Sequence, residues 1–151
     1  MNSPVSVLSS VILGGLLILA SLSDLRTLRI PNTLTFSLVA SGLLQGAFYS
    51  DQFTARLIGA ALGYGILALV GEAYFRLNGR EGLGLGDAKL FAGAGAWLGW
   101  QALPPVLLIA SIGGLLFALA GRTGEREPIP FAPFISLATF AIWAGTSLSP
   151  N

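Results

Sequence analysis

Long apolar segments separated by short polar breaks dominate the chain. Six segments can be drawn, each predicting one helix: 5–23, 31–49, 54–75, 87–101, 103–120 and 131–148. The breaks are polar or rich in proline and glycine: 24–30, 50–53, 76–86, 100–105 and 121–130. Several segments approach the roughly 20 residues that a helix needs to cross a bilayer core. The pattern predicts an all-α fold, a polytopic membrane helical bundle of about six transmembrane helices.

Composition supports a membrane protein and narrows the classes of function. Of the 151 residues, 54% are hydrophobic and 10% are charged, against roughly 25% charged residues in soluble domains. The net charge of +1 excludes a nucleic-acid-binding domain, which would carry a basic face. No soluble segment or long linker remains, so residues 1–151 are expected to form a single domain embedded in the lipid bilayer.

The positive charges predict the orientation of this bundle. Of the lysines and arginines, only Arg56 falls on the side opposite to the others, which are Arg26, Arg29, Arg76, Arg80, Lys89, Arg122 and Arg126. The positive-inside rule makes breaks 24–30, 76–86 and 121–130 cytoplasmic. An even number of spans then leaves both termini outside. Asp24 and Asp87 are thereby expected at the same, cytoplasmic side.

Small residues spaced four apart predict where helices pack closely. The pairs are Gly59/Gly63, Ala92/Ala96 and Gly95/Gly99. This small-xxx-small spacing lets two helix backbones approach each other. No internal repeat is visible, so the sequence gives no support to an inverted-repeat transporter.

Asp24 and Asp87 stand at the edges of apolar segments, where a carboxylate is costly and marks a functional site by default. The chain has no histidine and no cysteine, which excludes Ser-His hydrolases, His-Glu-x-x-His zinc proteases and thiol proteases. Among membrane-embedded hydrolases, an aspartyl mechanism remains, in which two adjacent carboxyl groups share one proton. Taken alone, each aspartate has a simpler interpretation: Asp87 as a helix N-cap, and Asp24 as a solvated charge near an arginine.

The fourth segment predicts a short helix. From Asp87 to Trp100 it would rise about 21 Å at about 1.5 Å per residue, against roughly 30 Å of hydrocarbon. A helix of this length is expected to leave a water-accessible notch above Asp87, which hydrolysis requires.

Three sequence elements, in this order, carry a resemblance to a known family. Asp24 is followed seven residues later by Pro31-Asn32. A Gly-x-Gly-Asp-x-Lys motif comprises Gly84, Gly86, Asp87 and Lys89, and is extended by residues 79–82 and 95–99. Near the end, Pro130-Phe131-Ala132-Pro133 is similar to a Pro-Phe-Gly-Pro element, with alanine in place of glycine. The chain resembles the prepilin peptidases, the type IV leader peptidases among the GxGD-type membrane aspartyl proteases.

This resemblance implies a function and a site. The expected substrates are type IV prepilins and the related pseudopilins of type II secretion, cut after a glycine that ends a short basic leader. Cleavage is expected at the cytoplasmic face of the bacterial inner membrane, with Asp24 and Asp87 as the catalytic pair. Residues expected to bind substrate or shape the site are Pro31, Asn32, Glu81, Gly84, Gly86 and Lys89. No metal is expected.

The resemblance is to the short, core-only members of the family. Many prepilin peptidases carry a cytoplasmic domain with paired Cys-x-x-Cys motifs, which goes with methylation of the new N-terminus from S-adenosylmethionine. This chain has no cysteine, so methyltransferase activity and that cofactor are not expected.

Other classes remain as alternatives. A small transporter or proton-relay protein would use paired intramembrane aspartates without cutting peptides. An assembly subunit with a vestigial site would need neither acid. A presenilin-type protease shares Gly-x-Gly-Asp but usually has a tyrosine before its first aspartate, where this chain has Ser23.

Overall fold

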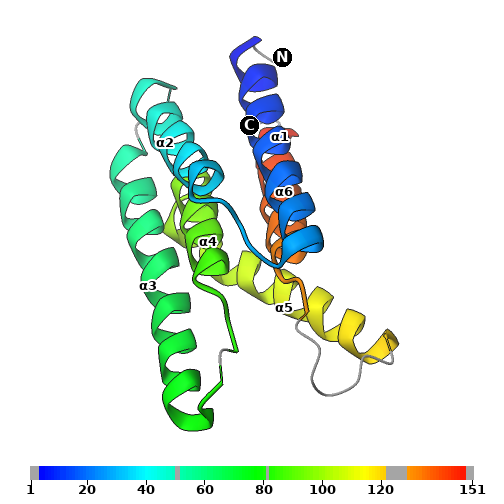
Figure 1. Cartoon of the computed structure of the whole chain (residues 1–151). Coiled ribbons are helices and arrows are strands. Elements are labelled where there is room, and N and C mark those ends of the chain that lie inside the picture. The colour runs from blue at the N-terminus through cyan, green and yellow to red at the C-terminus, as the bar shows by residue number, and fades with distance from the viewer. Residues whose placement is uncertain (1–3, 50–51, 81, 122–128, 149–151) are drawn as a thin grey trace.

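The structure, a computed structural model, describes residues 4–49, 52–80, 82–121 and 129–148. Its elements, shown in Figure 1, are α1 (Pro4–Thr27), α2 (Asn32–Tyr49), α3 (Phe53–Asn78), α4 (Leu85–Leu98), a short 3₁₀ helix η1 (Trp100–Ala102), α5 (Leu103–Ala120) and α6 (Ala132–Leu148). Each predicted segment corresponds to one α-helix, so the all-α fold is confirmed. The largest difference is at α1, which continues beyond the predicted residue 23, through Asp24, to Thr27.

Within the described part of the chain, three helices are long and apolar enough to cross a bilayer: Val5–Thr27, Phe53–Asn78 and Trp100–Ala120. The shorter helix Ala132–Ser147 is also apolar. Helix α4 has only 14 residues, which span about 21 Å and fall short of the roughly 30 Å hydrocarbon core. Its predicted shortness is confirmed, whereas the crossing of the membrane by all six helices stays a prediction.

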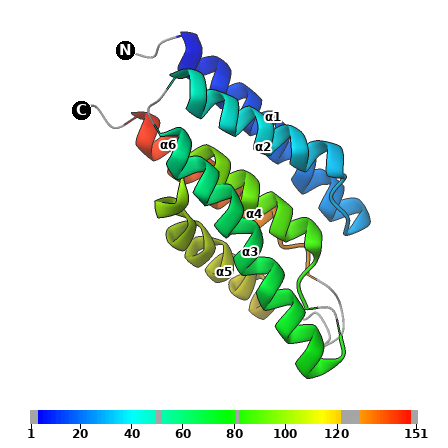
Figure 2. The ribbon, with the colours of Figure 1, turned by 90° about the vertical axis from the view of Figure 1, so that its left-hand side faces the viewer.

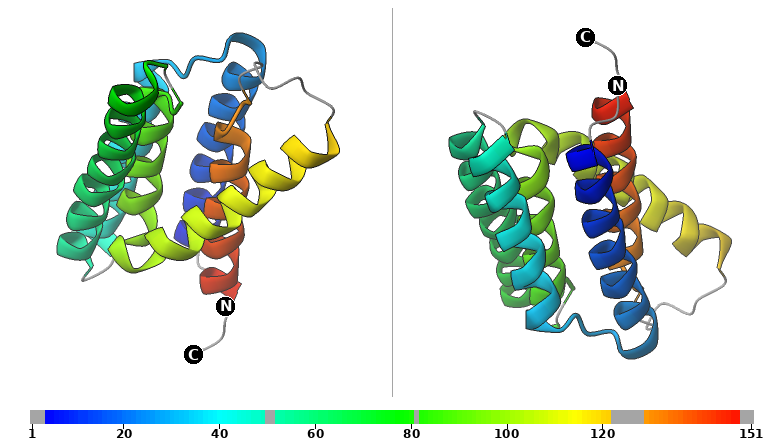
Figure 3. Two further views of the ribbon diagram at one scale, coloured as in Figure 1. Left: turned by 90° about the horizontal axis from the view of Figure 1, so that it is seen from below. Right: turned by 90° about the horizontal axis from the view of Figure 1, so that it is seen from above.

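The helices form two groups, which the views along the bundle in Figure 3 separate clearly. Helices α2, α3 and α4 lie together in one group, and α1 and α6 lie side by side in the other. Helix α5 packs on α6 at an angle, and its C-terminal end points away from the bundle (Figure 1). Contacts of α4 with α6 and of α1 with α2 join the groups.

Helix α4 is the buried centre of this arrangement. Every residue from Leu90 to Trp97 is buried, as expected for a helix that is apolar on all sides. The indole N–H of Trp97 donates to the Leu38 carbonyl of α2 at 2.9 Å. The same ring meets Trp143 of α6 edge-on, with centroids 5.3 Å apart. Helix α4 is therefore fixed to both groups, and it carries Asp87 in its first turn.

Glycines set the spacing of α4 against its neighbours. A Cβ added at Gly95 would overlap the backbone of Gly59 on α3, and one at Gly63 would lie 2.7 Å from the Phe91 carbonyl oxygen. The close packing predicted from Gly59, Gly63 and Gly95 is confirmed. Gly99 belongs to this contact as well, since a Cβ added at Gly59 would lie 2.8 Å from its carbonyl carbon. Gly99 also ends α4 with a φ of 84° that disfavours other residues.

Arg56 lies at the opposite end of the bundle from Asp24 and Asp87 and is only 6% exposed. Its Nη1 donates to the Gly42 carbonyl oxygen at 3.2 Å and to the side chain of Gln45. Both acceptors belong to the second half of α2. Arg56 therefore joins the end of α2 to the start of α3.

Candidate active site

Asp24 lies in the last turn of α1 and is 6% exposed. Its prediction as part of a loop at 24–30 is wrong, because α1 ends later, at Thr27. Leu28 adopts a φ of 52°, in the left-handed region that disfavours a branched side chain, and its N–H donates to the Asp24 carbonyl at 2.8 Å. The carboxyl group is therefore held by a helix, and its interpretation as a solvated charge is wrong as well.

Two hydroxyl groups fix the turn that follows Asp24. Ser23 Oγ donates to the Arg29 carbonyl at 2.8 Å, and Thr27 Oγ1 donates to the Ser23 carbonyl at 2.8 Å. Thr27 Oγ1 also lies 3.2 Å from the Arg29 carbonyl oxygen. The chain thus reverses toward α2 around Asp24 with its backbone fixed. This role of Ser23 and Thr27 was not predicted from the sequence, although hydroxyl residues at a helix end are a known signal for such bonds.

The carboxyl group of Asp24 is oriented by the start of α6. The backbone N–H of Ala132 donates to Asp24 Oδ2 at 3.1 Å. Ala132 is the first residue of α6 and is fully buried, and N–H groups at a helix start favour a carboxylate. Because the bond uses the backbone, alanine in place of the glycine of the related element preserves it. The Pro130–Pro133 element therefore belongs to the site.

Asp87 is held by the start of α4. The N-cap of α4 is Gly84, and Asp87 occupies the third helical position. The interpretation of Asp87 as an N-cap is therefore wrong. Its carboxylate turns back and accepts a hydrogen bond from the backbone N–H of Gly84, as the acidic member of a capping box does. Asp87 is half-buried, in contrast to the buried Asp24.

The two carboxyl groups come together at one end of the bundle. The C-terminal end of α1 and the N-terminal ends of α2, α4 and α6 converge there (Figure 2). Asp24 lies close enough to Asp87 for their charges to interact. The predicted placement of both aspartates at the same end of the bundle is therefore confirmed.

Lys89 and Asn32 connect the two sequence elements that carry the aspartates. Lys89 Nζ donates to Asn32 Oδ1 at 2.8 Å, which joins the fifth residue of α4 to the first residue of α2. Pro31 supports the same junction, because its carbonyl accepts the N–H of Leu34 at 3.1 Å where α2 begins. Pro31, Asn32 and Lys89 thus help to position α2 relative to α4 beside the site.

The Lys89–Asn32 bond gives a first testable prediction. Lys89→Met and Asn32→Leu are each expected to lower the rate of the catalysed reaction several-fold, because either change removes the bond that joins α4 to α2 beside the site. Since the bond is exposed to water, each is expected to cost only about 0.5–1.5 kcal/mol of unfolding free energy. The double variant should be no worse than the more damaged single variant. Additive losses in a double-mutant cycle would contradict this coupling.

The glycines between α3 and α4 serve different purposes. Gly79 ends α3 in the left-handed conformation, with a φ of 66°. Gly82 packs against Tyr74, whose ring leaves no space for a Cβ. Gly84 has an extended backbone that any residue adopts, and a Cβ there would meet only ordinary contacts, the nearest 3.7 Å away at Asp87 Oδ2. The fold therefore needs Gly79 and Gly82, whereas Gly84 keeps one side of Asp87 uncovered.

Other expected site residues are less informative. Gly86 lies against Ile30, and a Cβ there would be 3.4 Å from the Ile30 Cβ, so Gly86 contributes to the contact between α4 and the chain before α2. Glu81 lies outside the described residues. Arg122 and Arg126, which support the predicted orientation, lie outside them as well.

Comparison with known proteins relates this chain to one family. A model of the type IV leader peptidase family matches residues 11–119, a range that includes both aspartates. The prepilin leader peptidase/N-methyltransferase of Pectobacterium carotovorum subsp. carotovorum is 39% identical over 135 residues, which cover 85% of this chain and 48% of that protein. The proteins of the same name from Escherichia coli (strain K12) and Burkholderia pseudomallei (strain 1026b) are both 42% identical. These matches cover 79% and 80% of this chain and 55% and 40% of the relatives.

The chain thus spans about half the length of these curated relatives. No solved structure matches it significantly. The family model nevertheless covers most of the chain, together with the two elements that contain Asp24 and Asp87. The chain belongs to the type IV leader peptidase family.

Proposed function

We propose that residues 1–151 form one membrane-embedded aspartic endopeptidase domain that removes the basic leader of type IV prepilins and pseudopilins. The observation that carries this proposal is the pairing of Asp24 and Asp87. They come from separate sequence elements, their charges interact, and each is oriented by a backbone N–H at a helix start. Family membership and the names of the related proteins support the choice of substrate.

The pair supports hydrolysis by a bound water. One carboxylate takes a proton from the water while the water oxygen attacks the scissile carbonyl carbon, and the other carboxyl group donates a proton to the carbonyl oxygen. As the tetrahedral intermediate collapses, the C–N bond breaks and the leaving amine receives a proton from the pair. Asp24 remains bonded to Ala132 throughout, whereas Asp87 faces the side that Gly84 leaves open.

We infer that the reaction takes place at the cytoplasmic face of the inner membrane, with both termini outside. The start of α1 and the end of α6 lie at the end of the bundle opposite to the two aspartates (Figure 2). Arg26, Arg29, Arg76 and Arg80 lie at the aspartate end, in agreement with the positive-inside rule. Tagging the termini and testing their accessibility from outside spheroplasts measures this orientation.

The function is tested with a purified prepilin and the full chain reconstituted in vesicles. Mass spectrometry of the product is expected to show a new N-terminus immediately after the leader glycine. A matched prepilin with leucine in place of that glycine should remain intact. The mass also reports whether a methyl group is added when S-adenosylmethionine is supplied, and we expect none. Transport of a solute without any cleavage would instead support the transporter alternative.

Gly84 gives a prediction that separates substrate access from folding. Gly84→Ser is expected to lower cleavage at least ten-fold, because the added side chain covers part of the Asp87 carboxylate. Its melting temperature should not fall, since serine is a favourable N-cap residue and the backbone there is extended. Gly65→Ser on α3, where an added Cβ meets open space, is the control and should cut normally. Full activity of Gly84→Ser would contradict the access role.

A further inference from the structure

Ser23 and Gly86 are the residues that come immediately before the two aspartates. Both contact the segment of residues 28–31 that connects α1 to α2 (Figure 1), which we call the spacer. Ser23 is hydrogen-bonded to Arg29, and Gly86 lies against Ile30. Two consecutive residues of the spacer therefore contact the two helix ends that carry the catalytic pair.

The contact with Ser23 is polar and fixes the spacer to the end of α1. Ser23 Oγ donates to the Arg29 carbonyl at 2.8 Å, and Thr27 Oγ1 lies 3.2 Å from the same oxygen. Leu28 has a φ of 52°, a left-handed conformation that persists in a leucine only where the surrounding structure imposes it. The spacer therefore leaves α1 in one defined direction.

The contact with Gly86 is apolar and fixes the spacer to the start of α4. Ile30 is half-buried and packs against the apolar core. A Cβ added at Gly86 would lie 3.4 Å from the Ile30 Cβ and 3.5 Å from its Cγ1, so the Ile30 side chain rests on the backbone of α4. The position of Ile30 therefore determines where the first turn of α4 lies.

The two helices that carry the aspartates pack mainly on other helices. Helix α1 packs mainly on α6 and α2, whereas α4 packs mainly on α3, α2 and α6. The ring contact of Trp97 with Trp143 of α6 lies about ten residues after Asp87, some 15 Å along α4. At the aspartate end of the bundle, the spacer contacts both α1 and α4.

Resting on the proposed function, we propose that the spacer sets the separation of the two catalytic carboxyl groups, with Ser23 and Ile30 as positioning residues. Ser23 fixes the spacer relative to Asp24, and Ile30 fixes it relative to Asp87. Two carboxyl groups share a proton only while they stay close to each other. Loosening the spacer therefore weakens the pair without removing either acid.

The pH dependence of cleavage reports this separation. A pair that works as acid and base is active while it carries one proton, so its pH–rate profile has an acid limb and a basic limb. The charges of Asp24 and Asp87 interact in the structure. When two carboxyl groups move apart, this repulsion falls and the last proton leaves at lower pH. A loosened spacer therefore moves the basic limb to lower pH, whereas a smaller folded fraction lowers the rate equally at every pH.

Other charged groups do not account for such a shift. The basic residues of this end are Arg26, Arg29, Arg76, Arg80 and Lys89. Arginine and lysine side chains keep their charge near neutral pH. Helices α2, α5 and α6 carry no charged residue. Glu72, the remaining acid among the described residues, is ion-paired to Arg76 on α3, and Glu72→Gln is expected to leave the profile unchanged.

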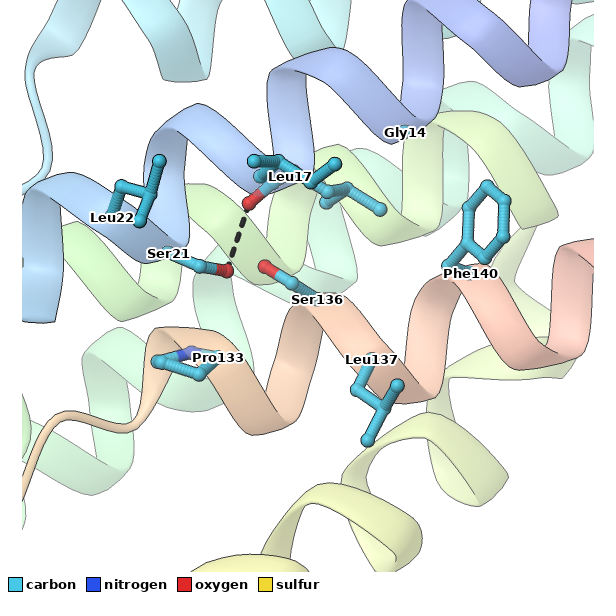
Figure 4. Close-up of a pocket in the computed structure, with 9 residues that line it drawn as sticks. Gly14, Leu17, Ser21, Leu22, Pro133, Ser136, Leu137 and Phe140 are labelled. Atoms are coloured by element: carbon cyan, nitrogen blue, oxygen red, sulfur yellow. Dashed lines mark hydrogen bonds between the residues drawn. The ribbon is translucent and has the colours of Figure 1, made fainter.

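Ser23→Ala tests the polar contact, with the full chain in vesicles and a purified prepilin. It is expected to lower kcat about five-fold at neutral pH with an unchanged KM, and to move the basic limb at least about 0.5 pH unit to lower pH. Ser23→Thr keeps the hydroxyl group and should restore most of the rate. Ser21→Ala is the matched control and should equal wild type, because Ser21 Oγ donates to the Leu17 carbonyl within α1 at 2.8 Å (Figure 4).

The hydroxyl group of Thr27 remains near the Arg29 carbonyl in Ser23→Ala. The double variant Ser23→Ala/Thr27→Val lacks both hydroxyl groups and is therefore expected to move the basic limb further. An unchanged profile in both variants, or a loss that is uniform at every pH, would overturn the proposal.

Ile30→Ala tests the apolar contact. It is expected to move the basic limb in the same direction, because the first turn of α4 loses the side chain that rests on it. Ile142→Ala shortens another partly buried isoleucine that packs on the core, in the second half of α6. This matched control should lower the melting temperature similarly but leave both limbs in place. A shift in both variants, or in neither, would contradict the role of Ile30.

A distance measurement separates this inference from the proposed function. The chain has no cysteine, so Arg26→Cys and Leu85→Cys, both at exposed positions, place one spin label at the end of α1 and one at the start of α4. The distribution of distances between the labels is expected to be narrow in the labelled parent and with Ser21→Ala, and to broaden with Ser23→Ala.

The two failures are distinguishable by this measurement. If the distribution broadens with Ser23→Ala but the wild-type chain cuts no prepilin, the proposed function fails, whereas the spacing of the aspartates by residues 28–31 is supported. If Ser23→Ala leaves the distribution unchanged, the inference is overturned, whatever the cleavage activity.

Discussion

Asp24→Asn is expected to abolish prepilin cleavage, with a loss of at least about 10³-fold, while the protein remains folded. The amide has the same shape, and its oxygen still accepts the N–H of Ala132. It can neither accept nor deliver the proton that general acid–base catalysis requires, a contribution of about 10²–10⁴-fold by itself. The rate and the melting temperature of the reconstituted protein are the measurements.

Asp24→Ala provides the structural comparison. It is expected to lose the same activity and also about 1–3 kcal/mol of unfolding free energy, because the buried N–H of Ala132 is left without an acceptor. A stability equal to that of Asp24→Asn would show that the Ala132 bond contributes little. Cleavage by Asp24→Asn at more than about a tenth of the wild-type rate would remove Asp24 from the catalytic pair.

Gly95→Ala is expected to be the most destabilising glycine-to-alanine substitution among the described residues. The new Cβ would overlap the backbone of Gly59, which cannot move aside as a flexible side chain does. Overpacking costs typically about 1–3 kcal/mol, and we expect a cost at the upper end of this range because both contact surfaces are backbone. Displacement of α4 would also move Asp87, so cleavage should fall together with the melting temperature.

A matched glycine on α3 controls for the change in backbone flexibility. Gly65→Ala places a methyl group in open space and is expected to raise stability by about 0.5–1 kcal/mol, because alanine favours a helix. If Gly95→Ala melts at the temperature of Gly65→Ala, close backbone packing does not hold α3 and α4 together.

The helices could be predicted from the sequence, and so could the placement of both aspartates at one end of the bundle. Apolar length marks each helix, and cations in alternate breaks place Asp24 and Asp87 at the same end. The exact end of α1 was not predictable, because it depends on Leu28 in a conformation that leucine rarely adopts. The ion pair of Glu72 and Arg76, four residues apart on α3, was predictable from spacing alone and is present at 2.7 Å.

Contacts between distant parts of the chain could not be predicted in the same way. The bond from Ala132 to Asp24 joins residues 108 positions apart, and the donor is a backbone N–H that any residue except proline provides. No residue type marks such a group. The Lys89–Asn32 bond depends likewise on how α2 packs against α4. The sequence elements indicated which regions of the chain belong to the site. Which atoms form hydrogen bonds there depends on how the helices pack.

The role of Asp24 and Asp87 as a pair is tested most directly by the cleavage rate of one purified prepilin with four reconstituted proteins. These are wild type, Asp24→Asn, Asp87→Asn and Glu72→Gln, the last replacing an exposed carboxylate on α3 outside the site. We predict cleavage after the leader glycine by wild type and Glu72→Gln at equal rates, and none by either aspartate variant. Loss of a general acid or base is expected to slow the reaction by about 10²–10⁴-fold. Cleavage by Asp24→Asn or Asp87→Asn at more than about a tenth of the wild-type rate would therefore contradict the catalytic pair.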